Sequence, residues 1–321
     1  MKYYIGIDLG GTNIAAGVVD ESCKIIARAS TPTKRPRSCA DISEDMARVA
    51  REAAFAAGIS LEDVEYIGVG APGTVNSETG RIEYSNNLDF YDEPLAEYIE
   101  SKTGRRVYIE NDANAAALGE FIAGAAKGRS SAVCITLGTG VGGGIIIDGK
   151  IYSGFNFAGA EIGHMVIEVD GAPCTCGRRG CFEAYSSATG LIRMTKEAMD
   201  ADPGSKMHEM VGDHVSGRLA FNAMRAGDKS AKAVVDKYIK YLAAGISNVI
   251  NIFQPEVLCI GGGVCNEGDA LMIPLREAVR EQVYSKRSQR NTEILRASLG
   301  NDAGIIGAAV LGLQRGNEVS L

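Results

Sequence analysis

The residues with the clearest chemical meaning lie between positions 158 and 183. One histidine and three cysteines in this stretch have the types and the close spacing of a tetrahedral Zn²⁺ site. Because four protein ligands leave no position open for water, such a site is structural rather than catalytic. The four residues are His164, Cys174, Cys176 and Cys181.

Two carboxylates belong to the same stretch. Glu161 precedes His164 by three residues, and Glu183 follows Cys181 by two. A metal on one ring nitrogen of His164 fixes its tautomer and leaves the other nitrogen as an N–H donor. One donor and two acceptors held in the same frame suit a polyhydroxylated ligand.

Two glycine-rich segments each lie between two apolar strands. They are Asp8-Leu9-Gly10-Gly11-Thr12 and Gly138-Thr139-Gly140-Val141-Gly142-Gly143-Gly144. Glycine allows backbone N–H groups to approach an anion closely. A plain hairpin turn is the alternative for the first segment, but the second has more glycine and threonine than a tight turn needs. We therefore predict that both segments bind a polyphosphate, with Asp8 orienting hydrated Mg²⁺; the residues are Gly10, Gly11, Thr12, Gly138, Thr139 and Gly140.

A third glycine segment, Gly261-Gly262-Gly263, follows the apolar strand 257–260. Open α/β sheets bind nucleotides at the carboxyl ends of their strands. The segment is not G-x-G-x-x-G, so a dinucleotide is a poor fit. It predicts contact with the base or ribose of a nucleotide.

Asp112 lies between a short apolar strand and an alanine-rich helix, in the sequence Glu110-Asn111-Asp112. One interpretation is that Asn111 or Asp112 caps the helix. The other is that Asp112 accepts the proton of an attacking hydroxyl, which is almost all that phosphoryl transfer needs beyond positioning and charge neutralisation. The two are compatible, because Asn111 can cap while Asp112 acts as base.

The elements that must position these residues alternate along the chain. Segments 4–26 and 133–152 resemble each other, each with an apolar strand, a Leu-Gly turn and a second strand. They predict two hairpins in a duplicated α/β unit. Beyond them we expect strands at 65–70, 106–109, 256–260 and 292–297, and helices at 43–57, 112–126, 228–253, 269–283 and 302–314. Alternating strands and helices predict an α/β fold.

Composition excludes several classes of protein. A length of 321 residues favours two domains. The net charge of −7, with no run of Lys or Arg longer than two, argues against nucleic acids and anionic membranes as partners. The chain enters a first strand directly rather than through a signal peptide, and no apolar run could span a bilayer, so we expect a cytoplasmic protein. The five scattered cysteines indicate free thiols, and His208 and His214 are expected at the surface.

Five motifs together resemble a known family. D-x-G-G-T, E-N-D-A-N-A-A-A, L-G-T-G-V-G-G-G, A-E-x-G-H and C-x-C-G-x-x-G-C-x-E occur in the order and spacing of the ROK family of bacterial sugar kinases and related repressors. The resemblance runs from Ile5 to about Leu313 and is nearest to the ATP-dependent glucokinases. One departure lies before Glu161, where Ala160 intervenes and Phe157 replaces a small residue, at the edge of the expected sugar pocket.

The resemblance implies two actin-like (ribonuclease-H-like) α/β domains around a central cleft. Residues 1–118, joined by a C-terminal helix 302–321, would form one domain, and 119–301 the other, with the zinc knuckle and the nucleotide site. Asp112 would be the catalytic base, with the Gly262 region at the adenosine. The four predicted zinc ligands match those of the family. The implied sugar contacts are Gly73, Asn87, Asn111, Asp112, Glu161, His164 and Glu183.

The expected reaction is transfer of the γ-phosphoryl group of ATP to O6 of D-glucose, with structural Zn²⁺ in the protein and Mg²⁺ on ATP. Fructose, N-acetylmannosamine and N-acetylglucosamine are alternative substrates, and a non-catalytic sugar-binding regulator is a further alternative that Asp112 disfavours. The expected partners are the hexose and ATP, with no nucleic acid and no membrane. We also expect a homo-oligomer, either a dimer or a tetramer.

Overall fold

The computed structural model describes residues 1–316, which form two compact units. The first unit contains residues 1–134, 144–160 and the segment that begins at Ala297, and the second contains residues 135–143 and 161–296. Strands and helices occur in both, so the predicted α/β fold is confirmed. The domains predicted from the sequence have other boundaries and stay a prediction, and residues 317–321 of the predicted C-terminal helix lie outside the described residues.

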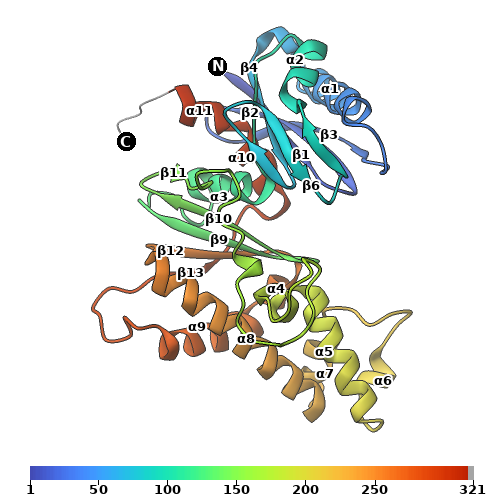
Figure 1. The fold of residues 1–321 in the computed structure, drawn as a ribbon, viewed down its shortest axis with the longest axis vertical. Helices are drawn as coiled ribbons and strands as arrows, with labels where there is room; N and C mark the ends of the chain where they lie inside the picture. The colour runs from blue at the N-terminus through green and yellow to red at the C-terminus, as the bar shows by residue number, and fades with distance from the viewer. Residues whose placement is uncertain (317–321) are drawn as a thin grey trace. The chain divides into compact units, whose positions relative to one another are not determined.

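A five-stranded mixed sheet is the centre of the first unit (Figure 1). Its order is β3 (Ile25–Pro32), β2 (Asn13–Asp20), β1 (Tyr3–Leu9), β4 (Val64–Ala71) and β8 (Val107–Asn111). β1 pairs antiparallel with β2 and parallel with β4, which pairs parallel with β8. The first predicted hairpin is therefore confirmed, and residues 10–12 form its turn.

Helices cover both faces of this sheet. In chain order the helical segments of the unit are α1 (Cys39–Ala56), η1 (Leu61–Asp63), α2 (Leu95–Thr103), α3 (Asp112–Ala123), η4 (Gly300–Asp302), α10 (Ala303–Ala309) and α11 (Leu311–Gly316). Ile5, Ile7 and Leu9 of β1 pack in one buried cluster with residues of α1 and α2. Tyr4 packs in another with Ile305 of α10. Alternate residues of β1 thus face opposite helical layers, as strand geometry requires.

α10 approaches the sheet and α3 backbone to backbone. A Cβ atom on Gly6 of β1 would lie 1.8 Å from the carbonyl oxygen of Ile305, and one on Gly68 of β4 would lie 1.7 Å from that of Ala308. On the helix itself, a Cβ on Gly307 would lie 1.6 Å from the carbonyl oxygen of Ala115 in α3. Only glycine permits this packing at these positions.

Asp8 lies on the face of β1 that α10 covers. A Cβ on Gly304 of α10 would come within 2.9 Å of the Asp8 carboxylate, so the helix passes directly over this side chain. Burial, with the nearby charge of Asp112 as a smaller cause, raises the pKa of Asp8 to about 6.

The C-terminal helix differs from its prediction. The predicted continuous helix is divided into η4, α10 and α11, and the chain leaves helical geometry at Val310. The hydroxyl of Tyr66 in β4 donates to the carbonyl oxygen of Ala309, the last residue of α10, at 2.7 Å. A side chain from a strand distant in sequence therefore satisfies a backbone carbonyl group at the point where the helix ends.

A small antiparallel sheet that the sequence did not predict also belongs to the first unit. It consists of β5 (Thr74–Asn76), β6 (Arg81–Ser85) and β7 (Phe90–Glu93). Its strands are short, and the longest has five residues. Two predicted sugar-contacting residues adjoin its strands: Gly73 directly precedes β5, and Asn87 lies between β6 and β7.

A second five-stranded sheet has the order β11 (Lys150–Ile151), β10 (Val141–Ile147), β9 (Ala132–Leu137), β12 (Val257–Gly261) and β13 (Glu293–Arg296). β9 and β10 form the second predicted hairpin, with a turn at residues 138–140.

The helical segments of the second unit are η2 (Ile162–His164), α4 (Phe182–Ser186), α5 (Ala188–Ala201), α6 (Met207–Met210), α7 (Leu219–Arg225), α8 (Lys229–Phe253), η3 (Gly263–Glu267) and α9 (Asp269–Gln282). Among residues 1–316, none of the helices combines the length and the apolar character that a bilayer span needs.

The buried position of Asp8 predicts a pH-dependent effect on stability. Asp8→Asn should raise the free energy of unfolding by up to about 2–3 kcal/mol at pH 7.5, because ionised Asp8 is disfavoured in the folded protein. Since the folded-state pKa of about 6 lies above the ordinary value of 3.8, the gain should shrink as pH falls from 6 and vanish near pH 4.

Urea unfolding of both proteins between pH 4.5 and 8, without added Mg²⁺ or nucleotide, measures the difference. Asp236→Asn, in an exposed ion pair with Lys232 on α8, is the surface control. A gain in stability that does not change with pH would show that Asp8 is ordinary in the folded state.

Candidate functional site

Two carboxylates lie where strands of the first sheet end. β1, β4 and β8 run parallel, and in the register of this sheet Asp8 is opposite Gly70 while Ala71 is opposite Asn111. Asp112 follows directly as the first residue of α3. Burial raises the pKa of Asp112, and the N–H of the following residue partly offsets this effect. Carboxylates with raised pKa values at strand ends are typical of functional sites.

Asn111 is the cap of α3, as one interpretation of the sequence predicted. Its Oδ1 accepts from the N–H of Ala113 at 2.9 Å and from that of Asn114 at 3.2 Å. Its Nδ2 donates to the carbonyl oxygen of Gly73 at 3.1 Å. Two predicted sugar-contacting residues are thus brought together, and Asp112 is not needed as the cap.

Gly73 requires glycine for two reasons. Its φ is 109°, and a Cβ there would lie 2.2 Å from the carbonyl oxygen of Tyr84 in β6. The small sheet therefore fixes the carbonyl that Asn111 contacts.

Glu110 is a buried carboxylate behind this pair that sequence reasoning did not single out. It is 5% exposed and accepts from the N–H of Asn111 at 2.9 Å and from Nδ2 of Asn114 at 3.1 Å. The hydroxyl of Ser153 donates to it at 3.3 Å. The only signal in the sequence was its place directly before Asn111.

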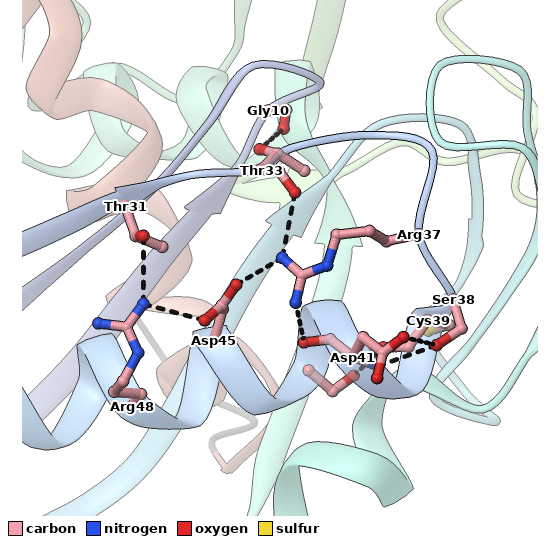
Figure 2. Close-up of polar contacts among 10 residues, drawn as sticks. Gly10, Thr31, Thr33, Arg37, Ser38, Cys39, Asp41, Asp45 and Arg48 are labelled. Atoms are coloured by element: carbon pink, nitrogen blue, oxygen red, sulfur yellow. Dashed lines mark hydrogen bonds and ion pairs between the residues drawn. The ribbon is translucent and has the colours of Figure 1, made fainter.

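The first glycine-rich turn is hydrogen-bonded to Thr33, which is fully buried. The Thr33 hydroxyl donates to the carbonyl oxygen of Gly10 at 2.7 Å, and the Thr33 N–H donates to that of Thr12 at 2.9 Å. Figure 2 shows the next layer, in which the guanidinium of Arg37 donates to the Thr33 carbonyl at 3.3 Å and to the Asp45 carboxylate at 2.5 Å. Thr33 therefore binds the carbonyl groups of Gly10 and Thr12, at the two ends of the turn.

Arg35 brings another predicted residue to this turn. Its guanidinium donates to the carbonyl oxygen of Asn87. A Cβ on Gly11 would lie 3.4 Å from the guanidinium carbon, so the Arg35 side chain also lies beside the turn. Asp8, the first turn, Gly73, Asn87, Asn111 and Asp112 all belong to the first unit.

The second glycine-rich turn is held by the segment 183–189. The N–H of Val141 donates to Oε2 of Glu183 at 2.9 Å. The carbonyl oxygen of Gly138 accepts from the N–H of Ala188 at 2.8 Å, and that of Thr139 accepts from the Thr189 hydroxyl at 2.8 Å. Glu183, predicted as a sugar contact, is therefore also a partner of this turn.

The glycine triplet lies beside the same turn. Gly262 has a φ of 90°, and a Cβ there would lie 2.4 Å from the carbonyl oxygen of Leu137 at the end of β9. Gly261 ends β12, and Gly263 begins η3. Gly262 thus packs against the residue that directly precedes residues 138–140, in the second unit.

The predicted metal ligands come together in the structure. The donor atoms of His164, Cys174, Cys176 and Cys181 all lie within 4.8 Å of one another. Nδ1 of His164 is 3.7 Å from Sγ of Cys174, and Sγ of Cys176 is 3.7 Å from that of Cys181. Tetrahedral Zn²⁺ with bonds of about 2.3 Å places sulfur ligands about 3.8 Å apart, so the residues fit this ion.

The four predicted metal ligands and their neighbours belong to the second unit. With Nδ1 of His164 facing the cysteines, Nε2 is the nitrogen left to donate to a ligand. Glu161 directly precedes η2, which contains His164. The two remaining histidines, His208 and His214, are exposed as predicted.

Comparisons with known proteins agree with these motifs. The chain is 37% identical to a glucokinase of Thermotoga maritima over 309 residues, which are 95% of each protein. Its fold is similar to that of a ROK family glucokinase of Streptomyces griseus in complex with glucose and AMPPNP, with a TM-score of 0.81, 36% identity, and coverage of 97% of this chain and 99% of that one. A ROK hexokinase of Thermus thermophilus is similar too, with a TM-score of 0.82, 33% identity, and coverage of 98% and 99%. The ROK family model matches residues 4–315, so the chain belongs to the ROK family.

Proposed function

We propose that this protein is an ATP-dependent sugar kinase that phosphorylates D-glucose at O6. The observation that carries the proposal is the division of roles at the end of β8. Asn111 caps α3, and Asp112, with a raised pKa, remains as a candidate base. The similarity over nearly the whole chain to a glucokinase in complex with glucose and AMPPNP supports glucose and ATP as the substrates.

Asp112 accepts the proton of the sugar's primary hydroxyl as that oxygen attacks the γ-phosphorus, and ADP leaves as its bond to that phosphorus breaks. A carboxylate with a raised pKa is a stronger base than an ordinary aspartate, which favours this transfer near neutral pH. Glu110 binds the backbone N–H beside it and so keeps the strand end in place.

The sugar is oriented by polar groups that the fold already holds. Asn111 and Gly73 are joined by a hydrogen bond, and Asn87 is held through its carbonyl group by Arg35. His164 donates through Nε2, and the carboxylates of Glu161 and Glu183 accept from ring hydroxyls. Asp112 contacts the primary hydroxyl that it deprotonates.

The phosphates of ATP are bound by backbone N–H groups of the two glycine-rich turns. Asp8 would orient Mg²⁺ that arrives with ATP, through water, and the ion would neutralise charge on the phosphates. Gly261, Gly262 and Gly263 contact the adenosine. The residues of the turns are Gly10, Gly11, Thr12, Gly138, Thr139 and Gly140.

His164, Cys174, Cys176 and Cys181 would hold Zn²⁺ in a structural role, because four protein ligands leave no position open for water. Binding the ion would fix the orientation of the His164 ring and of the chain on both sides of it. The expected cytoplasmic location and the expected homo-oligomer stay predictions.

The substrate is tested by measuring ADP release with glucose, mannose, fructose, N-acetylglucosamine and N-acetylmannosamine under one condition. We expect the highest kcat/KM for glucose, because each ring hydroxyl that lacks its partner leaves a buried polar group unpaired. The loop before Glu161, in which Phe157 and Ala160 have positive φ, is where a larger pocket would arise. A tenfold preference for fructose or an N-acetylated sugar would overturn glucose but not the kinase.

The role of Asp112 is tested by Asp112→Asn. The variant should lower kcat by a factor of roughly 10²–10⁴, because the general base is lost, while glucose still binds. Folding should be unchanged, since Asn111 caps the helix. Asp236→Asn on the exposed face of α8 is the control. Turnover at the rate of the unchanged protein would mean that Asp112 has no catalytic role.

The metal is tested by elemental analysis of protein purified without added metal, in which we expect one Zn²⁺ per chain. Cys176→Ser should lose the metal and weaken glucose binding, because the cluster orients His164. Cys23→Ser, which changes a half-buried cysteine outside the cluster, should keep it. Stoichiometric zinc in a triple variant of Cys174, Cys176 and Cys181 would refute the assignment.

A further inference from the structure

The second glycine-rich turn is bound by a segment of the chain that directly follows one of the metal ligands. Cys181, a metal ligand, is the residue directly before α4, and α4 carries Glu183. α5 begins two residues after α4 ends, and its first two residues contact the turn through the Ala188 N–H and the Thr189 hydroxyl. One short segment therefore joins the metal ligands to residues 138–141.

Glu183 has partners on both sides. Oε2 accepts from the N–H of Val141 at 2.9 Å, and Oε1 accepts from the hydroxyl of Thr175 at 3.2 Å. Thr175 lies between two of the metal ligands in the sequence. The carboxylate thus connects the turn to the loop that carries Cys174 and Cys176.

Two glycines show how closely these parts approach. A Cβ on Gly140 would lie 2.2 Å from Oε2 of Glu183. Gly163 lies next to the metal ligand His164, and a Cβ there would lie 2.2 Å from the carbonyl oxygen of Val141. The turn is therefore in contact with the chain around the metal both before and after the cysteines.

From these contacts we propose that Glu183 and Thr189 are positioning residues for the phosphate-binding turn, and that the metal cluster supports nucleotide binding as well as sugar binding. The inference rests on the proposed function, because it takes residues 138–140 to bind the phosphates of ATP. These contacts fix the carbonyl groups of Gly138 and Thr139 and the N–H of Val141. The other N–H groups of the turn are thereby held in one arrangement. A preorganised turn binds an anion without the cost of ordering the backbone.

If Glu183 bound only the sugar, its replacement would have a different effect. It would weaken glucose binding and leave the affinity for nucleotide, measured without sugar, unchanged. Thr189 separates the two roles further, because its hydroxyl bonds to the turn and it belongs to neither the metal ligands nor the predicted sugar contacts.

The experiment measures three quantities for each variant by calorimetry and elemental analysis. They are the Kd of Mg²⁺–AMPPNP without sugar, the Kd of glucose without nucleotide, and the zinc content. The variants are Thr189→Val and Glu183→Ala. The control is Thr195→Val, which removes a hydroxyl of the same helix that bonds within the helix to the carbonyl of Leu191.

Thr189→Val should weaken AMPPNP binding about threefold to tenfold, the effect of one neutral hydrogen bond, with glucose binding and zinc content unchanged. Glu183→Ala should weaken AMPPNP binding by about tenfold to a hundredfold, because a charge-assisted bond is lost, and should weaken glucose binding as well. Thr195→Val should bind both ligands like the unchanged protein. Zinc-free protein, prepared with a chelator, should bind AMPPNP more weakly without sugar present.

Unchanged AMPPNP affinity in both Thr189→Val and Glu183→Ala would overturn the inference and leave the kinase proposal intact. Failure of the unchanged protein to bind Mg²⁺–AMPPNP would instead refute ATP as the substrate, and the inference with it. Should Glu183→Ala not fold, Thr189→Val decides alone, since its single changed group lies on an exposed residue.

Discussion

The backbone-to-backbone packing of α10 is the constraint on which the first unit depends. Gly6 and Gly68 in the sheet and Gly307 in the helix leave no room for a Cβ atom, so the helix axis comes as close as the peptide groups allow. This closeness covers the face of β1 that carries Asp8, and the burial raises the pKa of Asp8 to about 6. α10, near the end of the chain, thereby contributes to the raised pKa of Asp8.

Both glycine-rich turns are fixed by groups outside them. Thr33 binds two carbonyl oxygens of the first turn, and Arg37, which is paired with Asp45, donates to the Thr33 carbonyl (Figure 2). At the second turn, Glu183 accepts from the Val141 N–H and the Thr189 hydroxyl donates to the Thr139 carbonyl. Glycine gives each turn access to an anion, but glycine alone would leave the backbone free to move. The supporting side chains supply the order that glycine lacks.

Much of this could be predicted where the pattern is local. The periodicity of the long helix placed it at 228–253, and the structure has Lys229–Phe253 with Asp228 as its cap. The ligand cluster was predictable because its members are close in sequence. Thr33 and Glu110 were missed, since each acts on residues whose identity gives no sign of the contact. The break at Val310 was missed because its partner, Tyr66, lies more than two hundred residues earlier.

The central claim is that the two glycine-rich turns bind the phosphates of the nucleotide. Hydrogen exchange of the amides at 10–13 and 138–143, measured with and without Mg²⁺–AMPPNP, tests it most directly. Slower exchange at both turns when the nucleotide is bound is the result that this account predicts. Unchanged exchange at either turn, at a concentration of AMPPNP that saturates the protein, would contradict it.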